Sequence, residues 1–251
     1  MKAIILAAGE GTRLRPYTND RPKCMVEFSG RPLIDHILGT MNECGLNDIV
    51  IVAGYRENIL KAHLTGKNVR FVTNPQYNST NMLATLFFAE NEMNDDVIIS
   101  YADIIYKKDI LSALMKSEAP FAIAVDRKWK ELWSLRMDDP LKDAETLKID
   151  ENGNVKELGK KPLSFDDIQG QYMGLTKISK DAIKKVKDHY HSLDRSQNYD
   201  GKDFNHMYMT SFIQHVIDYL MPVKPVFIDG GWIEIDSKDD LEIYNLKEIK
   251  F

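Results

Sequence analysis

The sequence has few of the residues that mark secreted, metal-stapled or membrane-spanning proteins. Its 251 residues include only two cysteines, Cys24 and Cys44, which do not form a CxxC motif. Neither a disulfide framework nor a zinc cluster is indicated, which fits a reduced cytoplasmic compartment. No apolar run approaches the roughly 20 residues of a membrane span. The N-terminal apolar run is too short for a signal peptide, because Glu10 and Arg13 follow it at once.

The charge balance excludes a class of partner. Lys and Arg number 33 and Asp and Glu 38, so the net charge at pH 7 is -5. A surface that coats nucleic acid should be basic, so no nucleic-acid partner is expected. Local basic clusters remain compatible with a small anionic ligand. With 43% hydrophobic residues and no repeat or low-complexity segment, the composition is that of a globular protein.

Short apolar runs alternate with helical patterns through the first half of the chain. The near-continuous apolar runs predict buried strands at 2–7, 48–54, 69–74, 96–103 and 121–126. Apolar residues at helical spacing predict helices at 32–45, 81–93 and 108–117. This alternation predicts an α/β fold, in which helices cover both faces of an open, largely parallel sheet with right-handed crossovers.

The pattern changes after Asp126. A hairpin turn is predicted at 151–154, a strand at 170–179, helices at 181–190 and 207–220, and strands within 224–236. Ser237 and Asp240 have the spacing of a capping box that opens a last helix. We interpret 1–251 as a single domain whose second half, 127–251, elaborates the sheet that 1–126 begins.

The loop after the first predicted strand is suited to binding a polyanion. Residues 7–11, AAGEG, place bare backbone amides at the carboxyl edge of the sheet, where open α/β sheets bind ligands. Glycine allows close approach to the main chain, successive amides form an anion-binding nest, and Arg13 and Arg15 can neutralise phosphate charge. The P-loop pattern is absent, and Leu14 stands where a dinucleotide fingerprint needs its third glycine. The two glycines alone are equally compatible with a tight turn.

The longer pattern LAAGEGTRLRPYT at 6–18, followed by RPK at 21–23, resembles the signature of nucleotidyltransferases that couple nucleoside triphosphates to phosphorylated small molecules. The resemblance implies a Rossmann-like, mostly parallel mixed sheet of the GT-A-like nucleotidyltransferase fold. Residues 1–126 would form its nucleotide-binding half and 127–251 its acceptor-binding half. It implies catalytic roles for Arg13 and Lys23, with Lys23 reaching the α-phosphate or the acceptor phosphate. The nucleotide-binding residues that it implies are Leu6, Ala7, Ala8, Gly9, Gly11, Thr12, Arg13, Tyr77, Thr80, Asn81 and Ala102.

The same resemblance predicts a metal-binding carboxylate after the fourth strand and a second late in the chain. Asp103 ends ISYAD, and Asp236 ends WIEID just before a predicted helix. Mg²⁺ prefers oxygen ligands and typically takes one or two carboxylates with phosphate oxygens and water. Asp103 and Asp236 are therefore the expected catalytic ligands of Mg²⁺, and Glu234 is a weaker candidate. The alternative role of Asp236 is that of a helix cap.

Nothing in the sequence resembles a nucleophilic triad. An acceptor that brings its own phosphate needs none, because a second pKa of about 6 leaves that phosphate largely ionised at neutral pH. Catalysis then consists of in-line positioning and charge neutralisation.

The segment NPQYNSTNMLATL at 74–86 resembles the base-and-ribose segment of choline-phosphate and phosphonate cytidylyltransferases. Tyr77, Thr80 and Asn81 stand at its motif positions, which favours CTP as the nucleotide. An alternative role for Asn81 is to begin a helix.

Two segments resemble the parts of these enzymes that face the acceptor: KELGKKP at 156–162 and GQYMGL at 170–175. Lys160 or Lys161 would hold the acceptor phosphate, and solvated surface lysines are the competing interpretation. The acceptor-binding residues that follow from the resemblance are Lys160, Glu157, Trp129, Arg127, Tyr172 and Gly174.

Residues 126–153, 168–175 and 199–212 together resemble the bacterial cytidylyltransferases that act on phosphoglutamine in capsule phosphoramidate synthesis. The resemblance covers nearly the whole chain. It implies that CMP passes from CTP to glutamine phosphorylated on its amide nitrogen, giving CDP-L-glutamine and pyrophosphate. The cationic and acidic side chains that would bind the glutamine backbone are Arg127, Lys128, Arg136 and Glu131.

Other acceptors and one other class stay open. Phosphocholine would need aromatic faces around its quaternary ammonium, which Trp129, Trp133, Tyr172 and Tyr208 could provide. Trp129 and Trp133 are spaced i, i+4, however, which is more typical of simple packing. 2-Aminoethylphosphonate and sugar 1-phosphates are further alternatives, and a non-catalytic nucleotide-binding subunit is the alternative class. The sequence does not disclose whether the chain forms a homo-oligomer.

Overall fold

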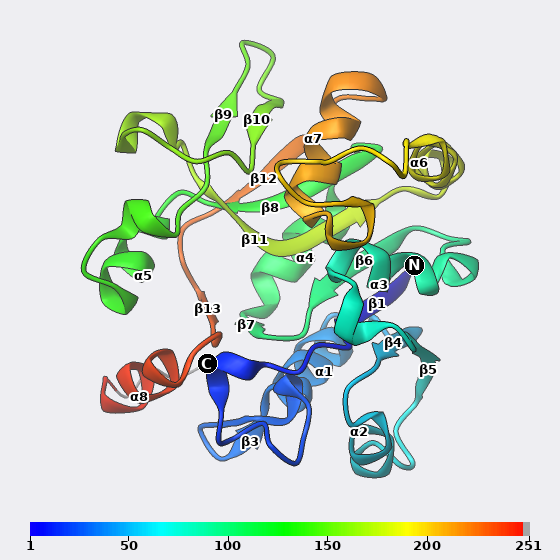
Figure 1. The fold of residues 1–251 in the computed structure, drawn as a ribbon, viewed down its shortest axis with the longest axis vertical. Coiled ribbons are helices and arrows are strands. Elements are labelled where there is room, and N and C mark those ends of the chain that lie inside the picture. The colour runs from blue at the N-terminus through cyan, green and yellow to red at the C-terminus, as the bar shows by residue number, and fades with distance from the viewer. Residues whose placement is uncertain (248–251) are drawn as a thin grey trace.

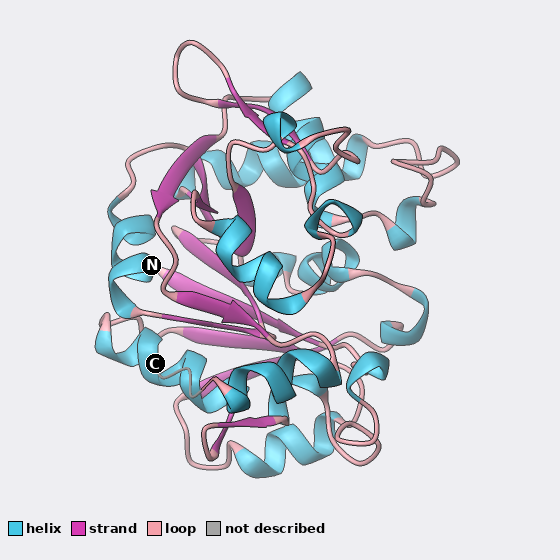
Figure 2. Ribbon diagram, turned by 90° about the vertical axis from the view of Figure 1, so that its left-hand side faces the viewer, coloured by secondary structure: helices cyan, strands magenta, loops and turns pink. Residues whose placement is uncertain are grey.

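A computed structural model describes residues 1–247 and shows a seven-stranded sheet between two layers of helices (Figures 1 and 2). The strand order is β12-β8-β11-β6-β1-β4-β5. Only β11 runs antiparallel to its neighbours, so the prediction of a mostly parallel, mixed sheet is confirmed. The seven strands are β1 (Lys2–Ala7), β4 (Ile49–Ala53), β5 (Val69–Thr73), β6 (Val97–Tyr101), β8 (Phe121–Asp126), β11 (Gln171–Ile178) and β12 (Lys224–Ile228).

The strands are apolar on both faces because helices cover both. In β1, Ala3 and Ile5 pack into one layer of core, whereas Ile4 and Leu6 pack into the other. The first layer is covered by α1 (Leu33–Glu43), α2 (Glu57–His63) and α4 (Lys108–Lys116). The second is covered by α3 (Met82–Phe88), α6 (Lys180–Ser192) and α7 (Met209–Tyr219). No helix within residues 1–247 is long and apolar enough to cross a membrane.

Element boundaries differ from expectation where the apolar repeat is weak. The helix predicted at 81–93 ends at Phe88, and a separate 3₁₀ turn follows at Glu90–Glu92. Helix α2 was not predicted, because Leu60 is its one buried residue and no apolar stripe marks it. Helix α5 (Trp129–Arg136) and strand β7 (Ile104–Tyr106) were missed too.

Three small two-stranded sheets complete the fold. The predicted hairpin is confirmed as β9 (Leu147–Ile149) and β10 (Val155–Leu158). Strand β13 (Trp232–Glu234) pairs with β7, and β2 (Glu27–Phe28) pairs with β3 (Arg31–Pro32). Helix α8 (Lys238–Leu246) begins with the predicted capping box, in which Ser237 and Asp240 exchange side-chain-to-backbone hydrogen bonds.

A third apolar cluster packs the segment after the glycine loop against β13 and α8. Leu14 and Phe28 pack there with Ile233 and Tyr244, and Phe28 meets the edge of the Tyr244 ring. Because these residues are fully or almost fully buried, the cluster holds the segment that carries Lys23 against β13 and α8. Residues more than 200 positions apart are thereby brought to one place.

Gly174 allows β11 to pass Tyr101. Its φ is +87°, and a Cβ at this position would lie 2.6 Å from Tyr101 Cδ2. We expect Gly174→Ala to lower the free energy of unfolding by about 2–4 kcal/mol, from left-handed strain plus steric overlap. Gly201 is the matched control, since its φ is +77° and a Cβ there would meet nothing within 4 Å. Urea unfolding should show Gly201→Ala losing only about 1 kcal/mol; equal losses would contradict the steric account.

Candidate active site

The glycine loop after β1 is shaped by Lys23. Gly11 has φ +64°, and a Cβ there would lie 2.8 Å from Lys23 Cβ, so only glycine lets this lysine pack against the loop. The Thr18 hydroxyl donates a hydrogen bond of 2.8 Å to the Gly11 carbonyl. A Cβ at Gly9 would instead meet nothing within 4 Å, so the main chain there is open to a ligand.

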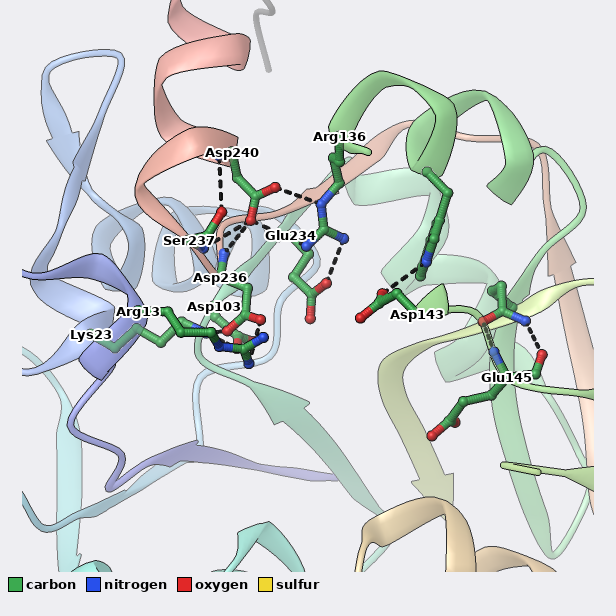
Figure 3. A network of polar contacts seen from close by, with 12 residues as sticks. Arg13, Lys23, Asp103, Arg136, Asp143, Glu145, Glu234, Asp236, Ser237 and Asp240 are labelled. Atoms are coloured by element: carbon green, nitrogen blue, oxygen red, sulfur yellow. Dashed lines mark hydrogen bonds and ion pairs between the residues drawn. The ribbon is translucent and has the colours of Figure 1, made fainter. Parts of the chain in front are cut away.

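Two cations and two carboxylates converge beside this loop (Figure 3). Lys23 Nζ donates to Asp103 Oδ2 at 2.6 Å and to Asp236 Oδ1 at 2.6 Å. The Arg13 guanidinium lies 2.5 Å from Asp236 Oδ2. The side chains of Lys23, Asp103 and Asp236 are only 14–16% exposed, so the two ion pairs of Lys23 are little screened by water, whereas Arg13 is 69% exposed. All four residues that were predicted to be catalytic therefore meet at one point.

The charges of the cluster are strongly coupled. Burial disfavours the Lys23 ammonium, but the carboxylates of Asp103, Asp236 and Glu234 outweigh it and raise the pKa of Lys23 well above its usual range. The lysine consequently stays protonated at any physiological pH.

Asp236 does not cap helix α8. Ser237 is the N-cap, and Asp240 accepts the backbone N–H of Asp236 at 3.0 Å and that of Ser237 at 2.8 Å. The buried Arg136 donates to Asp240 Oδ1 at 2.8 Å and to Glu234 Oε2 at 2.7 Å. Helix α5 thus fixes the turn that carries Asp236, which leaves its carboxylate free to face Lys23 (Figure 3).

A cavity of about 300 Å³ opens at the carboxyl ends of β1 and β6. It contains eight of the residues expected to bind nucleotide: Leu6, Ala7, Gly9, Gly11, Thr12, Arg13, Asn81 and Ala102. Lys23, Asp103 and Asp236 also line it, together with Cys24, Met82 and Glu234, of which Glu234 alone was anticipated as a candidate.

Three expected nucleotide contacts lie outside this cavity. The Ala8 carbonyl accepts the Tyr55 N–H at 3.0 Å, so Ala8 joins the loop to the end of β4. Tyr77 packs against Gly54, where a Cβ would lie 2.7 Å from Tyr77 Cβ. The Thr80 hydroxyl donates to the Gln76 carbonyl at 2.7 Å. Tyr77 and Thr80 shape the turn before α3. Asn81 lines the cavity although its Oδ1 also accepts the Met82 N–H at 2.7 Å as the helix cap.

A second cavity of about 420 Å³ adjoins the first and shares Arg13, Asn81, Met82, Glu234 and Asp236 with it. Of the six expected acceptor-binding residues, Tyr172 and Gly174 line this cavity. Eight residues that were not individually assigned to the acceptor also line it, and all but Tyr101 and Trp232 lie in the segments 126–153, 168–175 and 199–212: Tyr101, Asp143, Glu145, Gln171, Met173, Met209, Thr210 and Trp232. Most of them lie in irregular segments or at strand ends, where no periodicity indicates which side chains face inward.

The other four expected acceptor residues line neither cavity. Arg127 pairs with Asp229 at 2.7 Å on the surface. Trp129 is buried, and its ring packs edge-on against Trp133 at a centroid distance of 5.9 Å, as the i, i+4 spacing indicated. Lys160 and Glu157 face one another at 3.6 Å. The alternative interpretations of Trp129 as a packing residue and of Lys160 as a surface lysine describe where the structure places these two residues.

The fold and the composition of the site define a class of protein. Residues 3–165 match the family described as the MobA-like NTP transferase domain, so the chain belongs to that family. It is a nucleotidyltransferase.

Individual relatives agree with this class. The chain is 45% identical over 250 residues to the CTP:phosphoglutamine cytidylyltransferase of Campylobacter jejuni, covering 97% of this chain and 98% of that protein. It is 36% identical over 117 residues to the choline-phosphate cytidylyltransferase of Streptococcus pneumoniae, covering 47% and 51%. The solved inositol-1-phosphate CTP transferase of T. maritima has the same fold, with a TM-score of 0.77, 23% identity and coverage of 98% and 94%.

Removing Lys23 should leave a cluster of acids without its central cation. We expect Lys23→Ala to lower the free energy of unfolding by about 2–3 kcal/mol, since like charges then face one another in a poorly solvated site. Lys184→Ala is the control, because Lys184 forms a salt bridge with Asp188 but is 85% exposed, and pairs of that kind contribute about 0–1 kcal/mol. Chemical denaturation of both variants measures the difference. A Lys23→Ala protein as stable as wild type would show that the cluster is not held together by this lysine.

Proposed function

We propose that this protein is a Mg²⁺-dependent cytidylyltransferase that transfers CMP from CTP to L-glutamine phosphate and releases pyrophosphate. The observation that carries the reaction type is the convergence of Arg13, Lys23, Asp103 and Asp236 where the two cavities meet. The identity of 45% over 97% of the chain supports both CTP and phosphoglutamine as substrates. The product would be CDP-L-glutamine, made in the cytoplasm for capsule phosphoramidate. Phosphocholine and 2-aminoethylphosphonate are the alternative acceptors.

The donor set fits a divalent cation. Asp103 Oδ1 is buried without a hydrogen-bond partner, which is an atom that a metal ion would satisfy. Within residues 1–247 no group of three or more His, Cys, Asp or Glu side chains is arranged around a common metal position. Asp103 and Asp236 would therefore hold Mg²⁺ together with phosphate oxygens and water, the usual arrangement for this ion. When bound, Mg²⁺ would polarise the α-phosphate and screen its charge.

The chain itself binds, aligns and neutralises the reactants. An oxygen of the acceptor phosphate attacks the α-phosphorus of CTP, the bond from that phosphorus to its bridging oxygen breaks, and pyrophosphate leaves with the electron pair. The open main chain at Gly9 allows the triphosphate to approach backbone amides. Arg13 and Lys23 supply positive charge as the charge on the phosphoryl group is redistributed. No protein base is needed, since the attacking oxygen is already ionised.

Pyrophosphate release tests the substrates directly. The wild-type enzyme with Mg²⁺ is given CTP, UTP, TTP, ATP or GTP, each with L-glutamine phosphate, phosphocholine, 2-aminoethylphosphonate or glucose 1-phosphate. We expect release from CTP with L-glutamine phosphate. Release with another acceptor would retain the reaction and replace the substrate, and no release with any pair would favour a non-catalytic nucleotide-binding role.

Asp103→Asn removes one anionic ligand and keeps the size of the side chain. We expect kcat to fall by more than roughly 100-fold because transition-state charge is no longer neutralised in the same way. The circular dichroism spectrum should not change. Asp181→Asn, on an exposed position in the first turn of α6, controls for the chemistry of the substitution. Turnover at the wild-type rate in Asp103→Asn with Mg²⁺ would remove this aspartate from the metal site.

A further inference from the structure

Two carboxylates face the second cavity from the side opposite the Lys23 cluster. Asp143 and Glu145 lie just before β9, and both line the cavity together with Glu234 and Asp236 (Figure 3). Both lie in the segment 126–153, which carries part of the resemblance to phosphoglutamine cytidylyltransferases, but neither was singled out as an acceptor-binding residue. The acid-rich lining extends across the cavity that would receive the acceptor.

No cationic side chain that lines the second cavity pairs with Asp143 or Glu145. Arg13 is the one cationic side chain among the lining residues, and it pairs with Asp236 at 2.5 Å. Glu234 is paired with Arg136 at 2.7 Å. Across residues 1–247, neither Asp143 nor Glu145 forms a salt bridge. A ligand that enters this end of the cavity therefore meets two acidic side chains that pair with no cationic side chain of the described residues.

Glu145 is held in place by its backbone. The buried Gln171 accepts the Glu145 N–H at its Oε1 at 3.0 Å, and its Nε2 donates to the Glu145 carbonyl. The neighbouring Thr146 pairs with Gly159 and Lys160 through main-chain hydrogen bonds of 3.1 and 2.8 Å. The position of the carboxylate is thus set by the strand-like segment that carries it and by β11.

The ionised carboxylate of Glu145 lowers the stability of the folded protein at this position. Partial burial raises the pKa of Glu145 to about 7, and the nearby Asp143 acts in the same direction. The Thr210 hydroxyl is 3.5 Å from Glu145 Oε1, a long contact that compensates little. A group whose folded-state pKa is raised destabilises the folded protein when the pH is above that pKa, so packing does not explain an acid at this position. Residues that oppose stability are typical of binding sites.

The walls beside the two acids are aromatic. Tyr101 and Tyr172 lie edge to face at 5.9 Å, and Trp133 and Trp232 are 6.1 Å apart. The Trp133 Nε1 donates to Asp143 at 3.0 Å, which orients that carboxylate. Aromatic faces with nearby carboxylates are suited to a cation, because ring faces attract positive charge and carboxylates accept N–H bonds.

We infer that Glu145, assisted by Asp143, binds the primary ammonium group of the acceptor and selects phosphorylated amines and amino acids over neutral sugar phosphates. The inference rests on the proposed function for the identity of the acceptor. The acceptor phosphate would face Lys23 in the first cavity, and the ammonium would lie beside Glu145 in the adjoining second cavity.

Equilibrium binding tests this role without turnover. Calorimetry at pH 8 measures L-glutamine phosphate and its des-amino analogue, in which hydrogen replaces the α-ammonium, with a CTP analogue that cannot be cleaved. We expect the wild type to bind L-glutamine phosphate at least about 10-fold more tightly than the analogue, the preference that a charge-assisted hydrogen bond provides. Glu145→Gln should lose this preference and bind both alike. Glu151→Gln, in the exposed hairpin turn, is the control and should keep it.

A structural role for Glu145 would give different results. Because the buried negative charge is removed, Glu145→Gln should melt at or above the wild-type temperature at pH 8, while a residue needed for folding would melt lower. Wild-type binding of both ligands with equal affinity, binding of neither ligand, or an unchanged preference in Glu145→Gln would each overturn the inference. Failure of the proposed function is seen separately, as absence of pyrophosphate release with L-glutamine phosphate by the wild type.

Discussion

The ion pairs of Lys23 with Asp103 and Asp236 are the interaction on which the site depends. The two carboxylates lie 80 and 213 positions from the lysine in the sequence, yet both accept from one nitrogen at 2.6 Å. Gly11 gives Lys23 room against the loop, and the third apolar cluster presses its segment onto β13. Lys23 therefore joins three segments through its side chain: the glycine loop, the end of β6 and the turn after β13.

A second layer of contacts keeps the late carboxylate in place. Arg136 reaches from α5 to Asp240 and Glu234, and Asp240 in turn accepts the backbone N–H of Asp236. Helix α5 also contributes Trp133 to the wall of the second cavity. The wall of the second cavity and the turn that carries Asp236 are therefore joined through the buried guanidinium of Arg136.

The sequence predicts the parts of the structure that have strong local signals. Continuous apolar runs predicted the strands of the main sheet, and the spacing of Ser237 and Asp240 predicted the start of α8. The residues that line the second cavity were harder to predict, because a contact there depends on the direction in which a side chain of an irregular segment points. Trp129 faces the core instead of a cavity, and Glu145 faces the second cavity although nothing within the segment 126–153 singles it out. The grouping of Asp103 with Asp236 came from family resemblance, since long-range pairing has no local signal.

The most direct test of the account is a crystal structure with α,β-methylene CTP and Mn²⁺, whose anomalous scattering locates the metal. We expect an anomalous peak within ligand distance of Asp103 and Asp236, phosphates close to the main chain of Gly9, and the Lys23 ammonium moved from the carboxylates to a phosphate oxygen. A nucleotide bound elsewhere, or a metal peak away from both aspartates with Lys23 still between them, would contradict it.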